Sequence, residues 1–308
     1  MARVITTIIP IFMLIFLGAL SRRLGFMKDD FIVSANRLVF YLAIPALVFR
    51  ALSRAALRDG FAFWPVFTMT AAVLAVVGLA LLLAFAGPWR DGAWRATFIQ
   101  STVHGNLGYI GLAVAFYYLD EVGFARAGML VGFLMIVQNL FGVLLLQYLG
   151  RADHSPRRGR RALLSVLLNP VIIAALSGML FNLSGLLIPE VIDRFFMILS
   201  GLALPMGLLL IGASISFALL RRWLLWAGVI AFCKLLLLPG LAYCLFSAAG
   251  FEAAARLPAL ILLAAPTATL TYVMAREMGG QADLAVAAVS LTTMLSAFTY
   301  AFWLGLPG

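Results

Sequence analysis

The sequence predicts an all-α polytopic membrane protein. Of its 308 residues, 64% are apolar and only 11% are charged, whereas a soluble domain is nearer half apolar and a quarter charged. The apolar residues form ten runs of the length that a bilayer requires, and the 12 acidic residues lie outside these runs or at their edges. A membrane β-barrel would show shorter segments of alternating hydrophobicity. The expected architecture is therefore a bundle of ten transmembrane helices.

The first predicted span is Val4–Leu20, which is not expected to be a cleaved signal peptide because no small-residue cleavage site accompanies it. Within the runs, only Arg37 and Lys234 clearly intrude, with Arg50 near an end. The remaining spans, in chain order, are Phe31–Leu52, Phe61–Ala86, Ala96–Leu119, Ala127–Leu149, Leu163–Ser184, Phe195–Leu220, Trp223–Ala249, Leu257–Ala275 and Leu284–Leu306.

The net charge of +10 indicates basic loops on the cytoplasmic face and does not suggest a nucleic acid as partner. The loops on one side of the membrane carry more Lys and Arg than those on the other. They include the first loop, with Arg22, Arg23 and Lys28, and the segment 151–161. That face should be cytoplasmic, which places both termini outside the cytoplasm. We expect a multi-pass protein of the cell inner (plasma) membrane, with the lipid bilayer as its surroundings.

The chain divides into two halves, residues 1–150 and 162–308, joined by a short cytoplasmic loop at 151–161. The halves resemble each other at an offset of 160: Pro10 matches Pro170, Gly18 matches Gly178, and Leu42–Pro45 matches Leu202–Pro205. With five spans per half, the second half must enter the membrane inverted. Inverted repeats of this kind are typical of secondary transporters.

Two predicted spans contain helix-breaking sequence at corresponding places. Gly105 and Gly108 lie in the middle of span four, beside His104 and Asn106, and Pro266 breaks span nine ahead of Thr267 and Thr269. A broken backbone at mid-membrane persists only against water, protein or ligand. Two half-helix N-termini, after Asn106 and after Pro266, would direct partial positive charge at one place and bind an anion there. The alternative is two kinked helices without a ligand.

Three further charged or titratable side chains lie within spans. Lys234 is near the midplane of span eight and could attract an anionic substrate, neutralise a helix C-terminus or snorkel to the surface. Arg37 lies about two turns from the cytoplasmic end of its span, which favours snorkelling. His104 could relay a proton or bind a carboxylate, or it could be a neutral histidine bonded to a backbone carbonyl.

Several residues and absences narrow the function. Gln138 and Asn139 are expected to pack against span four, with ligand contact left open, and Thr292, Thr293 and Ser296 to join helices. Cys233 and Cys244 are interpreted as packing residues.

No carboxylate lies inside a span, and no protease, P-loop or dinucleotide motif is present. We therefore expect no enzyme, no metal and no cofactor.

The motifs resemble those of the auxin efflux carrier family, which includes plant carriers and bacterial malonate and malate permeases. The resemblance covers nearly the whole chain and is carried by the order of its motifs. They are Asn36–Phe49 in span two, Asn106–Gly111 in span four, Asn169-Pro170 and Leu210–Ser214 in spans six and seven, and Pro266–Thr269 with Ala275–Glu277 in span nine. Two positions differ from the family pattern: Gly105 replaces the usual span-four proline, and Leu270 or Thr271 an asparagine common in bacterial members.

The resemblance implies two inverted five-helix repeats with broken crossover helices four and nine. It implies a scaffold of helices one, two, six and seven, a moving transport unit made of helices three to five and eight to ten, and a homodimer formed through the scaffold. The ligand positions carried over are Asn106 and the Pro266–Thr269 stretch. Gly105, Gly108 and His104 border them, and Lys234 is a candidate charge partner.

The expected function is secondary transport of a small organic anion, such as malonate, malate or an auxin-like acid, by elevator-like alternating access. Three alternatives stay open. The first is a sodium-coupled carrier of the bile-acid type, which would share the fold. The second is a transporter-like receptor, which would bind a metabolite without moving it. The third is a channel, which would show single-channel conductance steps.

Overall fold

The computed structural model describes residues 2–54, 63–86, 91–150 and 168–306. These residues form helices and connecting turns, and none of them belongs to a named β-strand. The predicted loop 151–161, residues 61–62 of the third predicted span and residues 163–167 of the sixth lie outside the described residues.

The first half begins with α1 (Ala2–Arg23) and a helix that runs from Asp29 to Ser53 as α2 (Asp29–Leu38), a π-helical turn (Val39–Ala43) and α3 (Ile44–Ser53). The π-turn lies just before Pro45, whose ring cannot be accommodated in a regular helical ladder. The rest of this half is α4 (Phe63–Ala86), α5 (Gly92–Val103), a π-turn (Leu107–Gly111), α6 (Leu112–Tyr118) and α7 (Glu121–Leu149).

The second half, as described from Pro170, begins and ends with a continuous helix and has interrupted helices between them. Its elements are α9 (Pro170–Ser184), α10 (Glu190–Ser200), α11 (Ala203–Ala213), α12 (Phe217–Arg222), α13 (Leu224–Phe232), a π-turn (Cys233–Leu237), α14 (Leu238–Ala248), α15 (Ala253–Leu263), α16 (Leu270–Glu277) and α17 (Ala282–Gly305).

Among the described residues, seven helices are long and apolar enough to cross a membrane, and three shorter apolar helices accompany them. The shorter ones are Leu107–Tyr118, Pro170–Ser184 and Ala254–Leu263. The prediction of a helical, multi-pass membrane protein is confirmed at this level. The total of ten spans and the inverted relation of the halves stay predictions.

The seventh predicted span, Phe195–Leu220, has the wrong boundaries. The helix begins earlier, at Glu190, and ends at Ala213. Ser214 and Ser216 explain the end: the Ser214 hydroxyl donates to the Leu210 carbonyl, and the Ser216 N–H donates to the Ser290 hydroxyl instead of continuing the helix. Phe217–Arg222 forms the separate helix α12.

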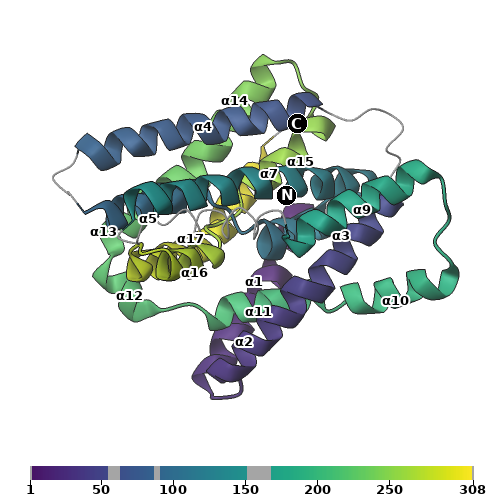
Figure 1. Cartoon of the computed structure of the whole chain (residues 1–308), viewed down its shortest axis with the longest axis horizontal. Coiled ribbons are helices and arrows are strands. Elements are labelled where there is room, and N and C mark those ends of the chain that lie inside the picture. Colours follow the sequence, from purple (N-terminus) through teal and green to yellow (C-terminus); the bar gives the residue numbers. More distant parts are fainter. Residues whose placement is uncertain (1, 55–62, 87–90, 151–167, 307–308) are drawn as a thin grey trace.

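The closest packing of the described helices falls into two groups, which also contact each other where α1 meets α6 and α17 and where α7 meets α3 and α9. In one group α1 packs along α11 and α3 along α9, and in the other α5 packs against α4, α7 and α17 (Figure 1). The first two contacts are close because of glycines: a Cβ at Gly18 would meet the Leu209 carbonyl oxygen, and one at Gly178 would meet backbone at Phe49. Small residues that allow such backbone approach are typical of membrane helix pairs.

Candidate functional site

The two broken helices meet and pair through their backbones. The Asn106 N–H donates to the Pro266 carbonyl at 2.7 Å, and the Ala268 N–H donates to the His104 carbonyl at 2.8 Å. These bonds form an isolated antiparallel bridge between Gly105 and Thr267. We call His104–Asn106 and Pro266–Ala268 together the crossover. Each broken segment satisfies polar backbone groups of the other, which membrane burial requires.

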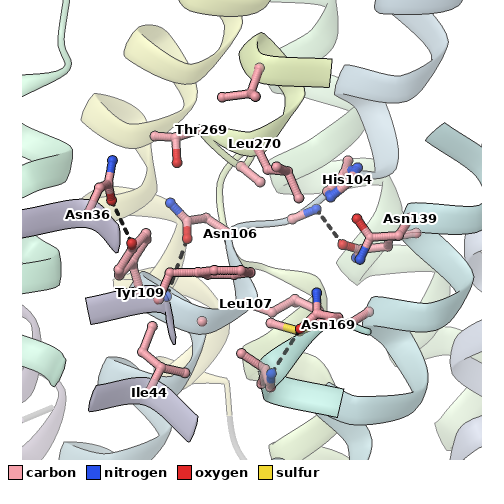
Figure 2. A pocket seen from close by; sticks show the side chains of 18 of the residues that line it. Asn36, Ile44, His104, Asn106, Leu107, Tyr109, Asn139, Asn169, Thr269 and Leu270 are labelled. Atoms are coloured by element: carbon pink, nitrogen blue, oxygen red, sulfur yellow. Dashed lines mark hydrogen bonds between the residues drawn. The ribbon is translucent and has the colours of Figure 1, made fainter. Parts of the chain in front are cut away.

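A cavity of about 430 Å³ lies beside the crossover (Figure 2). It is bounded by the starts of both second half-helices, because Asn106 and Gly108 line it from one and Thr269 and Leu270 from the other. The helix Asp29–Ser53, α7 and the start of α9 complete its wall. The remaining lining residues are Val33, Asn36, Arg37, Phe40, Tyr41, Ile44, His104, Gly105, Leu107, Tyr109, Met135, Gln138, Asn139, Asn169, Val171, Ala268 and Val273.

Two buried amide groups present hydrogen-bond donors without a partner. The Asn106 Oδ1 accepts the Tyr109 N–H at 3.3 Å, and the Gln138 Oε1 accepts the Gly105 N–H at 3.1 Å. Each oxygen is therefore held by a backbone donor, so the amide NH2 must be the other end. In the described part of the chain, Asn106 Nδ2 and Gln138 Nε2 have no hydrogen-bond partner. Buried donors of this kind suit an anionic oxygen.

One cation lines the same cavity. Arg37 is exposed at the end of α2, and no described residue forms an ion pair or hydrogen bond with it. The neighbouring Asn36 accepts the Tyr109 hydroxyl at 2.6 Å, and the Tyr109 ring packs over Gly207 of α11. Tyr109 thus links the segment after the crossover to α2 through Asn36 (Figure 2) and to α11 through Gly207.

The structure brings most of the predicted site residues together. His104, Gly105, Asn106, Gly108 and Thr269 all line the cavity. The His104 Nδ1 lies 3.4 Å from the Gln100 Nε2, so the imidazole is held on the helix it ends.

Pro266, Thr267 and Lys234 lie outside the cavity lining. The fully buried Thr267 donates its hydroxyl to the Ser101 carbonyl at 2.9 Å, and its N–H donates to the Thr292 hydroxyl at 3.0 Å. Its contacts are those of a residue that fixes the crossover, and they offer no support for the expectation that it touches the ligand. The bond to Thr292 matches the role of joining helices expected for that residue.

Lys234 lies behind the crossover, fully buried, in the π-turn Cys233–Leu237. Its Nζ donates to the carbonyl of Leu263, the last residue of α15, at 2.7 Å. Of the roles considered for Lys234, this geometry matches neutralisation of a helix C-terminus, where the macrodipole places negative charge. A Cβ at Gly105 would lie 3.2 Å from the same Nζ, so only glycine leaves the ammonium its full space.

Sequence reasoning missed several lining residues. Arg37 was assigned to snorkelling, and Asn36, Tyr109 and Asn169 were not considered as site residues. The sequence could have identified Asn36 and Arg37 as candidates for the site, because they are the first two residues of the span-two motif Asn36–Phe49. Asn169 lines the cavity while its Oδ1 caps α9 through the Val171 N–H. The described residues contain no cluster of three His, Cys, Asp or Glu side chains that could hold a metal ion.

Comparison with known proteins gives a consistent picture. The family described as "Membrane transport protein" matches residues 3–160 and 155–304. A "Putative malonate transporter" of Rhizobium meliloti (strain 1021) is 26% identical over 309 residues, covering 97% of this chain and 94% of its own. An "Uncharacterized transporter" of Methanothermobacter thermautotrophicus is also 26% identical, covering 96% of both chains. A further one, of Methanocaldococcus jannaschii, is 22% identical, again covering 96% of both.

Proposed function

The chain belongs to the membrane transport protein family, the family of the auxin efflux carriers, and from that premise we propose that it is a secondary transporter of a small organic anion. Family membership and the long apolar helices make it a multi-pass membrane protein and a transporter rather than an enzyme. The substrate class and the mechanism are the proposal.

The observation that carries the proposal is the convergence of unpartnered donors on one cavity. Asn106 Nδ2 and Gln138 Nε2 have no partner among the described residues, and the Arg37 guanidinium stands in the same lining. A carboxylate can accept from both amides and neutralise the guanidinium. Without a ligand, burial of each free amide donor has a cost of about 1–3 kcal/mol. An anion that accepts from these amides removes that cost, and we place its carboxylate beside Asn106 and Gln138.

Movement of the substrate would be elevator-like. The two packing groups support a scaffold of α1, α2–α3, α9 and α10–α11 and a transport unit of the remaining helices. Asn106 and Gln138 belong to the transport unit, whereas Arg37 belongs to the scaffold, so displacement of one unit against the other carries the anion away from Arg37. Release on the opposite face follows from that separation. We place both termini outside the cytoplasm, in the inner membrane, and a homodimer contact on the scaffold.

The test compares the uptake of labelled organic acids by proteoliposomes that contain the Gln138→Glu variant with uptake by those that contain the Gln147→Glu variant. In Gln138→Glu a carboxylate keeps the acceptor for the Gly105 N–H but replaces the free donor with a repelling charge. Gln147 lies on the same helix, α7, outside the cavity lining, and serves as the control. We expect the first variant to lose acid uptake and the second to keep it.

Equal uptake by the two variants would contradict the site. Ligand binding without flux in the parent protein would favour the receptor alternative, and flux that requires a sodium gradient would favour the sodium-coupled carrier. Conductance steps in planar bilayers would identify a channel.

A further inference from the structure

A second cavity, of about 290 Å³, lies at the C-terminal end of the helix Asp29–Ser53 and shares no lining residue with the cavity beside the crossover. Its walls come from α3, from the last turn of α6 and from the beginning of α7, so we call it the α3–α7 cavity. Its lining residues are Leu47, Arg50, Ala51, Arg54, Phe116, Glu121, Val122, Phe124 and Ala125.

The charges of the α3–α7 cavity stand on different walls. Arg50 and Arg54 line the α3 wall, and both pair with Asp193 of α10, which lies outside the lining; the Arg50 Nε is 3.0 Å from the Asp193 Oδ1. Glu121 lines the α7 wall, and its carboxylate forms no ion pair or hydrogen bond with the part of the chain that the structure describes. Because Asp193 balances one arginine and Glu121 the other, the cavity is neutral as a whole but carries separated charges.

Both arginines keep hydrogen-bond donors for a ligand. Arg50 uses Nε and Nη2 on Asp193, and Arg54 uses Nη2, so each guanidinium has at least one further nitrogen that bonds no described residue. The neighbouring Asp120 does not compete for them, because its carboxylate accepts the Gly123 N–H at 2.8 Å in its own helix. The α3 wall therefore offers donors to a phosphate, and the α7 wall offers one free acceptor to an ammonium.

The α3–α7 cavity lies where two membrane-spanning helices end. The helix Asp29–Ser53 and α7 are both long and apolar enough to cross a membrane, and Arg54 and Glu121 lie at their adjoining ends. Charged side chains at such ends reach the level of the lipid headgroups. Phe116 and Val122 of the same lining are exposed, and they give apolar chains a surface beside the charges.

From this arrangement we infer that the α3–α7 cavity binds the headgroup of a zwitterionic phospholipid of the phosphatidylethanolamine type. The phosphate lies at Arg50 and Arg54, the ammonium lies at Glu121, and the acyl chains run along Phe116 and Val122. A phosphate without an ammonium would be repelled by Glu121, and an ammonium without a phosphate would be repelled by the arginines. A ligand that carries both charges matches both walls.

The experiment measures the dissociation constant of the first lipid that binds the full chain in detergent, by native mass spectrometry. The probes are dioleoyl phosphatidylethanolamine and dioleoyl phosphatidylglycerol, which share chains and phosphate but differ in the ammonium. We expect the parent protein to bind the first at least about tenfold more tightly, a difference of about 1.4 kcal/mol. Soluble O-phosphoethanolamine at the same concentration should not displace it, because it lacks the acyl chains.

Three variants locate the binding. Glu121→Gln keeps the side-chain shape but removes the partner of the ammonium, so the preference for phosphatidylethanolamine should fall about tenfold. Glu252→Gln is the matched control, because Glu252 is also exposed at a helix start, that of α15, but lies outside the lining. Arg54→Gln should weaken binding of both lipids about tenfold, while Arg50 still pairs with Asp193. Thermal melting checks that each variant folds.

The parent protein alone can overturn the inference, by binding the two lipids equally. A preference for phosphatidylethanolamine that persists in Glu121→Gln, or that is lost equally in Glu252→Gln, would also overturn it. Displacement of the lipid by an equal concentration of O-phosphoethanolamine would assign the cavity to a soluble zwitterion instead. None of these measurements involves transport or the cavity beside the crossover, so they leave the proposed function untouched.

Discussion

The two broken helices differ in what they contribute to the crossover. The first, at His104–Asn106, directs side chains into the cavity, where Asn106 presents a free amide. The second, at Pro266–Ala268, supplies backbone: the Pro266 carbonyl accepts from Asn106, and Thr267 is committed to Ser101 and Thr292. Two breaks at corresponding positions of the chain therefore have different tasks, one in recognition and one in support.

The ends of the preceding half-helices are satisfied differently as well. At the first break, the Ser101 carbonyl of α5 receives the neutral hydroxyl of Thr267. At the second, the Leu263 carbonyl of α15 receives the ammonium of Lys234. The ammonium of Lys234 thus lies on the supporting side of the crossover, behind Gly105.

The largest effect is expected from Asn106→Asp, which breaks recognition at the first helix. The new carboxylate can still accept the Tyr109 N–H, but it repels an anion where a donor attracted one. Because like charges in contact cost several kcal/mol, we expect the transport rate at low substrate to fall about 100-fold. Proteoliposome uptake measures this, with thermal melting as the control for folding. Uptake within twofold of the parent protein would contradict the role of Asn106.

Thr267→Val tests the supporting break and should affect stability more than substrate affinity. The substitution keeps the side-chain shape but removes the hydroxyl that donates to the Ser101 carbonyl. An unpaired buried carbonyl has a cost of about 1–3 kcal/mol, so the melting temperature should fall by several degrees. The KM of transport should stay within about twofold of the parent value. A KM raised tenfold with unchanged melting would instead place Thr267 on the ligand.

Gly105→Ala examines the contact between the two breaks. The backbone of Gly105 is not among the positive-φ glycines, so alanine is conformationally allowed. Its Cβ, however, would lie 3.2 Å from the Lys234 Nζ and 3.3 Å from its Cε, so we expect a loss of about 1 kcal/mol or more from overpacking.

The control for this substitution is Gly228→Ala on α13, where a Cβ would meet nothing within 4 Å. Alanine should stabilise that helix by up to about 1 kcal/mol. Opposite shifts of the two melting temperatures are the expected result. A stabilised Gly105→Ala variant would show that Lys234 can move aside.

The smallest effect is expected from Thr269→Val, two residues beyond Thr267. Thr269 is half-buried in the cavity lining, and its hydroxyl has no hydrogen bond among those of the described residues. The free energy of unfolding, followed by thermal melting, should change by less than about 0.5 kcal/mol. A drop as large as that of Thr267→Val would remove the distinction between the lining and the supporting threonines.

Much of this arrangement could be predicted because helix breaking is a local property. Gly105 and Pro266 mark the two breaks, and the apolar runs located the helices that the structure describes. The end of the seventh predicted span was wrong because apolar Ile215, Phe217 and Ala218 continue the run past Ser214, where the backbone leaves the helix.

The orientation of side chains at the breaks could not be predicted. In an extended segment Thr267 and Thr269, two residues apart, would point to the same face. Thr269, however, already has helical backbone angles (φ −60°, ψ −26°), so spacing alone does not decide which of the two faces the ligand. The tertiary contacts decide it, through Ser101 and Thr292. The place of Arg37 in the cavity lining was missed for a different reason: its distance from the helix end does not reveal a cavity beside it.

The crossover also has a consequence for biosynthesis. The Thr267 hydroxyl bonds a carbonyl 166 residues earlier in the chain, and Lys234 bonds a carbonyl 29 residues later. A nascent chain that has reached Lys234 thus holds an ammonium whose acceptor has not yet been made, and its first broken helix lacks the partner that pairs its backbone. The crossover and the cavity beside it therefore cannot form until the second broken helix has been synthesised.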